Sequence, residues 1–187
     1  MAKKNYAAEH DSNLLWLDLE MTGLDPASDR IIEMALIATD QNLEIIARSP
    51  SWVISCPDDI LDGMDDWNKR THGKSGLLAE VRQSQLSITQ AQQQALIFAR
   101  KWAIKGRSPM CGSTICQDRR FLSQWMPELE SYFHYRNFDV SSFKLAAIFF
   151  KPELVAFENQ DSDHRAVSDI EDSIAEMRHY RKAMLSP

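Results

Sequence analysis

The sequence predicts an α/β domain in which a mixed, five-stranded sheet is flanked by helices. Three apolar runs of strand length follow one another before residue 57. The clearest helical periodicity comes later, where helices alternate with two further strand-like runs. Consecutive strands followed by such alternation indicate a mixed sheet with helices on its faces. The 187 residues, 44% hydrophobic and 26% charged, suit one globular domain with a sizeable core, expected over residues 13–187.

The first half of the chain supplies three expected strands, at 14–23, 30–40 and 43–56. The turn signal Gly23-Leu24-Asp25-Pro26 follows the first strand, and Ser49–Pro50 is the point where the third is open to a break. The link between the second and third strands is short enough for a hairpin, so the sheet is expected to begin antiparallel.

The rest of the chain predicts mainly helices. The clearest of them has Ala91, Ala95, Phe98 and Trp102 at helical spacing. Ser87 or Thr89 is its candidate cap, and Ser141 or Ser142 is the candidate cap of a later helix. The remaining expected elements are a short helix or loop at 65–72, a short helix at 77–82, helices at 89–103, after Asp118, at 128–133, through 149 and at 166–184, strands at 108–114 and 137–140, and a loop at 151–163.

Composition limits the location and the partners. Residues 1–12 are polar, so a disordered lead-in is expected there rather than a secretory signal, and no apolar run is long enough to cross a membrane. Three cysteines without paired spacing argue against a disulfide framework and a zinc ribbon, and favour a reducing, cytoplasmic location. The net charge of −6 argues against a protein that grips long nucleic acid, duplexes included, but is compatible with a site for very short nucleic acid.

Two carboxylates stand inside the first expected strand. Side chains alternate across a strand, so Asp18 and Glu20 are expected on one face, with the neighbouring leucines on the other. Burying two ionised carboxylates together is costly unless cations neutralise them, and paired oxygen ligands suit Mg²⁺ or Mn²⁺. Asp-x-Glu is a common pattern, repeated at Asp169-Ile170-Glu171, so a solvated strand end is the alternative.

Three further residues stand at expected strand ends or helix starts. Asp118 follows a strand, where an N-cap is the alternative role. His164 precedes the last helix and Asp169 lies in its first turns, although a lone His is more often a satisfied or surface residue. Four acids from separate elements could hold two divalent ions about 4 Å apart, which would clamp the attacking and leaving oxygens of a phosphodiester. A nearby His then fits as the general base.

The motifs that contain these residues resemble those of the oligoribonucleases, a branch of the DEDDh exonuclease family. The likeness runs from about Asn13 to Leu185, and two of its segments, Trp67–His72 and Tyr132–Arg136, are typical of this branch rather than of the wider family. Its motifs are WLDLEMTGLDP, MDDWNKRTHGKSGL, QDRRFL, MPELESYFHYR, DVSSFK and HRAVSDI. The resemblance implies an RNase H-like fold, with His164 as general base and with four metal-binding acids, Asp18, Glu20, Asp118 and Asp169.

The resemblance also implies a substrate and a partner. It implies a homodimer that trims very short RNAs, dinucleotides above all, from the 3′ end to 5′ mononucleotides, with linear pGpG as one candidate substrate. Leu24 would wedge against the bases, Arg136 and Ser141 would cap the 5′ phosphate, and His134 and Tyr135 would reach the partner's site. Stacking faces, a charged fork and a hydroxyl suit those tasks. The complete expected substrate set is Thr22, Gly23, Leu24, Trp67, His72, Thr114, Gln117, His134, Tyr135, Arg136 and Ser141.

Several alternatives stay open at this point. Trp67 could be a core residue, and Arg136 could pair with Glu128 or Glu130 on the surface. The family typically has Gly-Asn-Ser-Ile-Gly-Gln-Asp where this chain has Gly112-Ser113-Thr114-Ile115-Cys116-Gln117-Asp118, which affects substrate contacts rather than metal ligands. Ser142 stands where Thr is common. A proofreading-type exonuclease for single-stranded DNA and a non-catalytic, dimeric dinucleotide-binding module are the rival functions.

Overall fold

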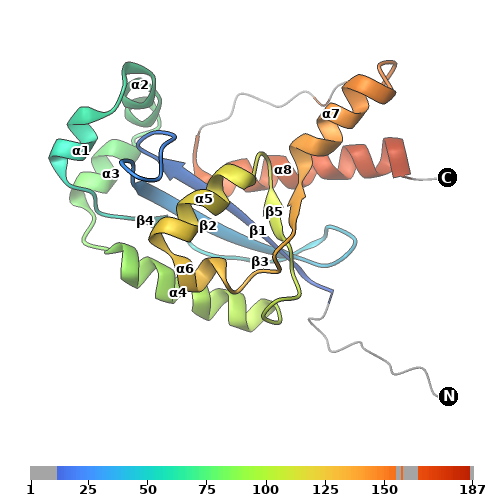
Figure 1. Ribbon diagram of the computed structural model, residues 1–187, viewed down its shortest axis with the longest axis horizontal. Helices are drawn as coiled ribbons and strands as arrows, with labels where there is room; N and C mark the ends of the chain where they lie inside the picture. The colour runs from blue at the N-terminus through green and yellow to red at the C-terminus, as the bar shows by residue number, and fades with distance from the viewer. Residues whose placement is uncertain (1–11, 155–156, 158–163, 186–187) are drawn as a thin grey trace.

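A mixed sheet runs through the middle of the molecule (Figure 1), a computed structural model that describes residues 12–154, 157 and 164–185. The strand order is β3-β2-β1-β5-β6, with β4 paired to β2. The central strand β1 (Leu14–Met21) is antiparallel to β2 (Ile31–Thr39) and parallel to β5 (Met110–Gly112), which is parallel to β6 (Asn137–Asp139). The predicted mixed sheet is confirmed. The predicted lead-in at 1–12 lies outside the described residues except for its last residue.

The sheet has six strands rather than the five predicted, because the third expected strand divides. β3 (Ile45–Arg48) and β4 (Trp52–Val53) both pair antiparallel with β2. Pro50 lies between them and has no N–H to donate to a ladder. Ser49 Oγ accepts a hydrogen bond from the Leu36 amide at 2.9 Å, so the chain stays tied to β2 through the break. The expected interruption at Ser49–Pro50 is therefore confirmed.

Helices cover the two faces and one end of the sheet. The first three helices after β4 form a group at one end of the sheet. The sequence analysis predicted no helix at the first of them, residues 58–63. None of the described helices is long and apolar enough to span a membrane. The helices are α1 (Asp58–Gly63), α2 (Asp66–Lys74), α3 (Leu77–Gln83), α4 (Ile88–Trp102), α5 (Cys116–Trp125), α6 (Pro127–Glu130), α7 (Val140–Phe150) and α8 (Ala166–Tyr180), which continues into a π-helical turn, Arg181–Leu185.

The two caps predicted for helices have different outcomes. Ser87 caps α4 in a capping box with Gln90, as expected. The cap of α7 was predicted at Ser141 or Ser142, and this is wrong. β6 passes directly into α7, so the helix begins earlier and Asp139 is its N-cap, accepting from the Ser141 amide at 3.0 Å.

The alternation of β1 divides its side chains between two cores. Leu15, Leu17 and Leu19 pack in one core with residues of α4 and α5. Trp16 packs in the other core, with Ile170 and other residues of α8. The face that carries Trp16 is also the face of Asp18 and Glu20, so the fold directs both carboxylates toward α8.

Candidate active site

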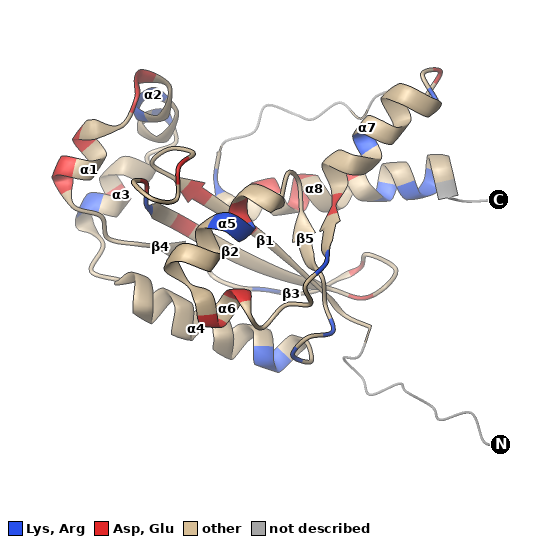
Figure 2. Cartoon of the chain, viewed as in Figure 1, with Lys and Arg blue, Asp and Glu red and all other residues tan. Residues whose placement is uncertain are grey.

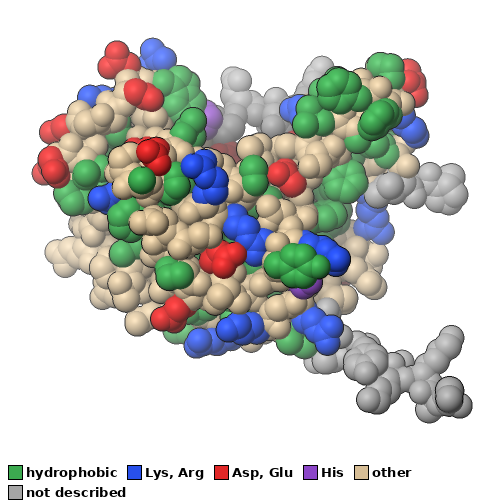
Figure 3. Space-filling model, viewed as in Figure 1, with side chains coloured by type: hydrophobic (Ala, Val, Ile, Leu, Met, Phe, Trp, Pro, Cys, Tyr) green, Lys and Arg blue, Asp and Glu red, His purple; other side chains and the backbone are tan. Residues whose placement is uncertain are grey.

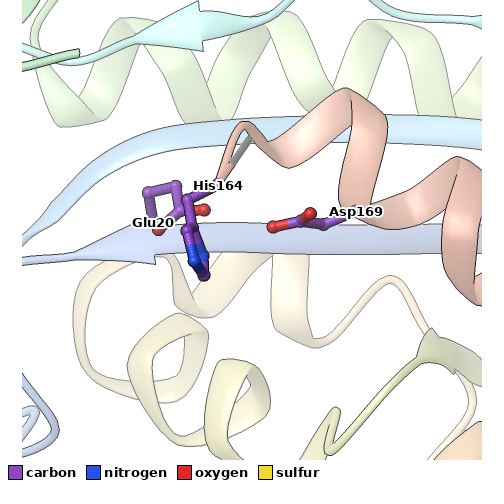
Figure 4. Close-up of side chains that lie close together, drawn as sticks. All are labelled: Glu20, His164 and Asp169. Atoms are coloured by element: carbon purple, nitrogen blue, oxygen red, sulfur yellow. The ribbon is translucent and has the colours of Figure 1, made fainter. Parts of the chain in front are cut away.

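The carboxyl end of β1 brings its two acids to the amino end of α8. Asp18 lies opposite Ala35 on β2, and Glu20 lies opposite Glu33. Figure 2 shows acidic residues gathered on β1, β2 and α8 in this region. In Figure 4, Asp169 points from α8 toward Glu20 and His164. The alternative of a solvated strand end does not describe this arrangement, because α8 covers the face on which both acids stand.

Asp118 joins this group from α5. It is the third residue of the helix, whose N-cap is Ile115, so the N-cap alternative is wrong. Asp118 Oδ1 accepts a hydrogen bond from the Leu19 amide at 3.1 Å, and the residue is only 6% exposed. The carboxyl is therefore held against the backbone of the residue that separates Asp18 from Glu20.

His164 and Asp169 complete the cluster from the start of α8. Ligand atoms of Glu20, His164 and Asp169 all lie within 4.8 Å of one another. The His164 ring meets the Trp67 ring edge to face, with centroids 5.7 Å apart. Trp67 is 53% exposed, so the alternative of a core tryptophan is wrong. The chain thus brings four acids, one imidazole and one exposed aromatic ring to a single place.

The acids of the cluster raise one another's pKa. Burial, followed by repulsion from Asp169 and Glu33, raises the pKa of Glu20 to about 9. Burial and the charge of Asp118 raise the pKa of Asp18, and burial raises the pKa of Asp118 to about 7. Such a cluster is unfavourable by itself and favourable around a cation, and its oxygen-rich donors fit a hard divalent ion.

His72 lies behind Glu20 rather than in the cleft. It is 1% exposed, its Nε2 is 3.1 Å from the Met21 carbonyl, and its Nδ1 is 3.8 Å from Glu20 Oε2. Nδ1 is buried and has no hydrogen-bond partner among the described residues. The expectation that His72 contacts substrate is at odds with this burial, since Glu20 stands next to its ring.

Leu24 projects from a loop that is closed on itself. Thr22 Oγ1 donates to Asp29 Oδ1 at 3.0 Å, and the Asp25 amide donates to Asp29 Oδ2 at 2.9 Å. A Cβ on Gly23 would lie 2.5 Å from Asp29 Oδ2, so any other residue at this position would displace the Asp29 carboxylate that closes the loop. Gln117 Nε2 donates to the Leu24 carbonyl at 2.6 Å, while the Leu24 residue remains 73% exposed. Gln117 and the loop therefore hold an apolar side chain out toward solvent.

A cleft of about 280 Å³ opens beside the acids. Thr114 does not line it, but its hydroxyl lies 3.0 Å from Ser141 Oγ, and its amide also donates to that oxygen at 3.0 Å. Thr114 has a φ of 53°, a strained value for a β-branched residue. The lining residues are Asp18, Ser113, Ser141, Lys144, His164, Asp169, Asp172, Ser173 and Glu176.

Sequence reasoning missed two features of this cleft. Lys144 follows Ser141 by three residues on α7, a helical spacing that would have placed it on the same face. Ser113, the departure from the family's Asn, lies 2.9 Å from Ser173 Oγ on α8. The shorter side chain thus joins the end of β5 to α8 through a pair of hydroxyls.

His134, Tyr135 and Arg136 lie outside the lining of this cleft, on the segment before β6. Tyr135 is 75% exposed, and the Arg136 guanidinium lies over its ring, 5.1 Å from the centroid. Glu130 pairs with Arg119, and the described residues offer Arg136 no ion pair, so the alternative of a surface pair between Arg136 and Glu128 or Glu130 is not found. Arg119 also donates to the carbonyls of all three residues. The backbone of this segment is therefore held in place, while its side chains lie outside the cleft beside the acids of their own chain.

A family model and individual relatives both place the chain among exonucleases. The RNase_T family model, described as Exonuclease, matches residues 15–177. The chain is 53% identical to an oligoribonuclease of Chromobacterium violaceum, covering 95% of this chain and 98% of that protein. It is 51% identical to an oligoribonuclease of Nitrosomonas europaea, covering 96% and 99% of the two chains.

Solved structures show the likeness of the fold. The zinc-bound complex of Escherichia coli exonuclease I with single-stranded DNA has a TM-score of 0.68 at 17% identity, over 93% of this chain and 41% of that one. A further exonuclease I structure has a TM-score of 0.67 at 18% identity, over 91% and 41%. The chain therefore spans about two fifths of the length of exonuclease I, in an RNase H-like exonuclease fold.

Proposed function

Because this chain belongs to the oligoribonuclease family of exonucleases, we propose that it is a hydrolase that degrades very short RNAs from the 3′ end to 5′ mononucleotides, dinucleotides above all. The observation that carries the proposal is the convergence of four acids and one imidazole beside a single cleft. Members of this family are metal-dependent nucleases. The non-catalytic binding module is disfavoured, because the four acids and the His that the proposed hydrolysis uses are all present and lie together.

Asp18, Glu20, Asp118 and Asp169 would hold two divalent ions, Mg²⁺ or Mn²⁺. When bound, such ions supply charge neutralisation at the phosphate and a water of lowered pKa. The raised pKa values of Glu20 and Asp118 support this role, since a cation between these carboxyls would favour their ionised forms. The buried hydrogen bond from the Leu19 amide keeps Asp118 in place for it.

His164 acts as the general base in this proposal. Its ring lies beside Glu20 and Asp169, where it can accept the proton of an attacking water. The water oxygen then forms a bond to phosphorus, the bond from phosphorus to the 3′ oxygen breaks, and the leaving 3′ oxygen takes a proton from solvent. The products are a 5′ mononucleotide and a shortened RNA with a free 3′ hydroxyl. Trp67, edge-on to His164, offers a stacking face next to the reacting phosphate.

The polar groups in and beside the cleft suit a dinucleotide. Ser141 in the lining and Thr114 next to it present hydroxyls, and Lys144 adds a cation. Leu24 is exposed in the loop that follows β1. A 5′ phosphate at the hydroxyls would mark the end of the substrate, so a longer RNA would have to place another nucleotide there. We assign Arg136 to the same phosphate. Linear pGpG is one candidate substrate.

We also propose a homodimer. Four large apolar side chains on α7 are exposed by 52–80%: Leu145, Ile148, Phe149 and Phe150. Figure 3 shows apolar side chains gathered in the region of α7. A second copy of the chain would cover this apolar surface. His134 and Tyr135, held away from the acids of their own chain, would then reach the partner's site. The three cysteines are unpaired, in keeping with the cytoplasmic location that we predict.

A ladder of 5′-phosphorylated RNAs from two to ten nucleotides, with and without Mg²⁺ or Mn²⁺, tests this function. The dinucleotide should be hydrolysed fastest, and chelation should abolish turnover. His164→Ala should lower kcat by about 10²- to 10⁴-fold while dinucleotide binding stays intact. Faster cleavage of a long single-stranded DNA would favour the proofreading-type rival, and near-normal turnover by His164→Ala would remove the proposed base.

A further inference from the structure

Glu33 is a buried acid beside the site that the proposed chemistry does not use. It stands in the apolar strand β2, opposite Glu20, and is 0% exposed. Its carboxylate accepts a hydrogen bond on Oε1 from Arg165 Nη2 at 2.8 Å and one on Oε2 from Arg165 Nε at 3.3 Å. Ser51 Oγ donates to the same carboxylate. A buried, bidentate ion pair of this kind fixes the orientation of both partners.

The carboxylate of Glu33 also closes the amino end of α8. Arg165 is the N-cap residue of the helix, but its own side chain makes no capping hydrogen bond. The Ala166 amide donates to Glu33 Oε2 at 3.0 Å instead. A negative charge is favourable at a helix amino terminus. A residue of β2 therefore fixes where α8 begins, two residues after His164.

His164 needs such an anchor because its backbone is strained. Its φ is 51°, in the left-handed region that residues other than glycine rarely adopt. Arg165 follows directly and is held from two sides, since it also donates to Glu80 on α3, at 3.0 Å through Nη1 and at 2.8 Å through Nη2. α3 contacts α2, the helix that carries Trp67. The same guanidinium thus ties the His164 turn both to the strand beside Glu20 and to the helices around Trp67.

We propose that Glu33 is a positioning residue for the general base: by holding Arg165 and the first amide of α8, it sets the place of the His164 imidazole beside Glu20 and Asp169. The inference rests on the role of His164 in the proposed function. If the pair only stabilised the fold, its loss would lower the melting temperature without acting through His164. A positioning residue acts on kcat, and only while His164 is present.

A double-mutant cycle separates these two roles. The variants are Glu33→Gln, which keeps the shape and one acceptor, His164→Ala, and the two combined. Steady-state kinetics on a 5′-phosphorylated RNA dinucleotide at saturating Mg²⁺ should show Glu33→Gln lowering kcat about tenfold, with KM changed by less than about twofold. In the His164→Ala background, Glu33→Gln should lower the residual kcat by less than about twofold.

Glu171→Gln is the matched control, because Glu171 is also an acid paired with an arginine, Arg48, but lies on α8 away from the cleft lining. It should leave kcat within about twofold of the parent. An unchanged kcat in Glu33→Gln, or an equal fall in both backgrounds, would overturn the inference. Near-normal turnover by His164→Ala would instead count against the proposed general base, so the two failures are distinct.

A second variant keeps the inference testable if Glu33→Gln does not fold. Arg165→Lys keeps the positive charge but not the fork that reaches Glu33 and Glu80 together. Circular dichroism melts would establish that it folds. It should show the same fall in kcat and the same dependence on His164, and a parent-like kcat in this folded variant would equally overturn the inference.

Discussion

The carboxyl end of β1 and helix α7 depart in opposite ways from the usual distribution of side chains. At β1, charged groups are packed against one another, and their burial raises the pKa values of Glu20 and Asp118. On α7, large apolar groups face solvent, and Phe150 is 80% exposed. The first region is relieved by cations and the second by an apolar surface. Each region therefore favours one kind of partner, a cation at the carboxyl end of β1 and a second apolar surface on α7.

The largest expected effect concerns the charged region. Asp18→Asn removes one of the proposed metal ligands and should lower kcat by at least about 10³-fold. The same change should raise the melting temperature measured in a chelator, because it removes one of several repelling buried carboxyls. A fall in that temperature would contradict the view that these acids are unfavourable without a cation. Asp62→Asn, at an exposed acid paired with Arg82, serves as the control.

A substitution in the apolar region of α7 should change the association of two chains and not the chemistry at the acids. Phe149→Asp should raise the dissociation constant of the dimer at least about 100-fold, because a symmetric interface loses the burial of the ring twice, at about 1.5–3 kcal/mol each time. Sedimentation velocity across a dilution series would measure it, with Phe149→Leu as the control. The stabilisation of the variant by Mg²⁺ should equal that of the parent. An unchanged dissociation constant would mean that α7 is not the covered surface.

Trp67 lies between the two categories, since it is an exposed ring beside the acids. Trp67→Ala should raise the KM for a dinucleotide about tenfold through loss of stacking, which is worth about 1–3 kcal/mol per base. Trp67→Phe should recover most of that loss. A KM that does not change in Trp67→Ala would show that the bases do not contact this ring.

A further expected effect is a dependence of stability on pH. Glu20 has a folded pKa raised from 4.5 to about 9, and Asp118 one raised from 3.8 to about 7. Between those limits the folded chain binds more protons than the unfolded chain, so the free energy of unfolding should fall as pH rises from about 5 to 9 in the absence of metal. A saturating divalent ion should remove this slope. Melting temperatures in a chelator and in Mg²⁺ would show it, and a rise with pH in the chelator would refute it.

Much of the central region could be predicted from the sequence, because local rules govern it. Alternation placed Asp18 and Glu20 on one face, and Pro50 marked the break that made a sixth strand. Other features depend on contacts between distant segments. Asp139, not a serine, caps α7, because β6 runs directly into the helix. The burial of His72 behind Glu20 comes from the packing of α2, which no local pattern describes.

Glu33 shows the limit most clearly. An acid within the apolar run Ile31–Thr39 is a visible anomaly in the sequence, and it could have been noted there. Its partner, Arg165, is 132 residues further along the chain. Only the fold makes the two meet.

The closed loop that presents Leu24 has a consequence for the size of the ligand. A two-nucleotide molecule makes few contacts, so it cannot offset the conformational entropy that would be lost if the loop ordered only on binding. Here the Asp29 carboxylate and the Gln117 amide already fix the backbone on both sides of Leu24. The conformational entropy of this loop is therefore lost when the chain folds and not when the ligand binds. A small ligand then meets a surface that is already ordered before it binds.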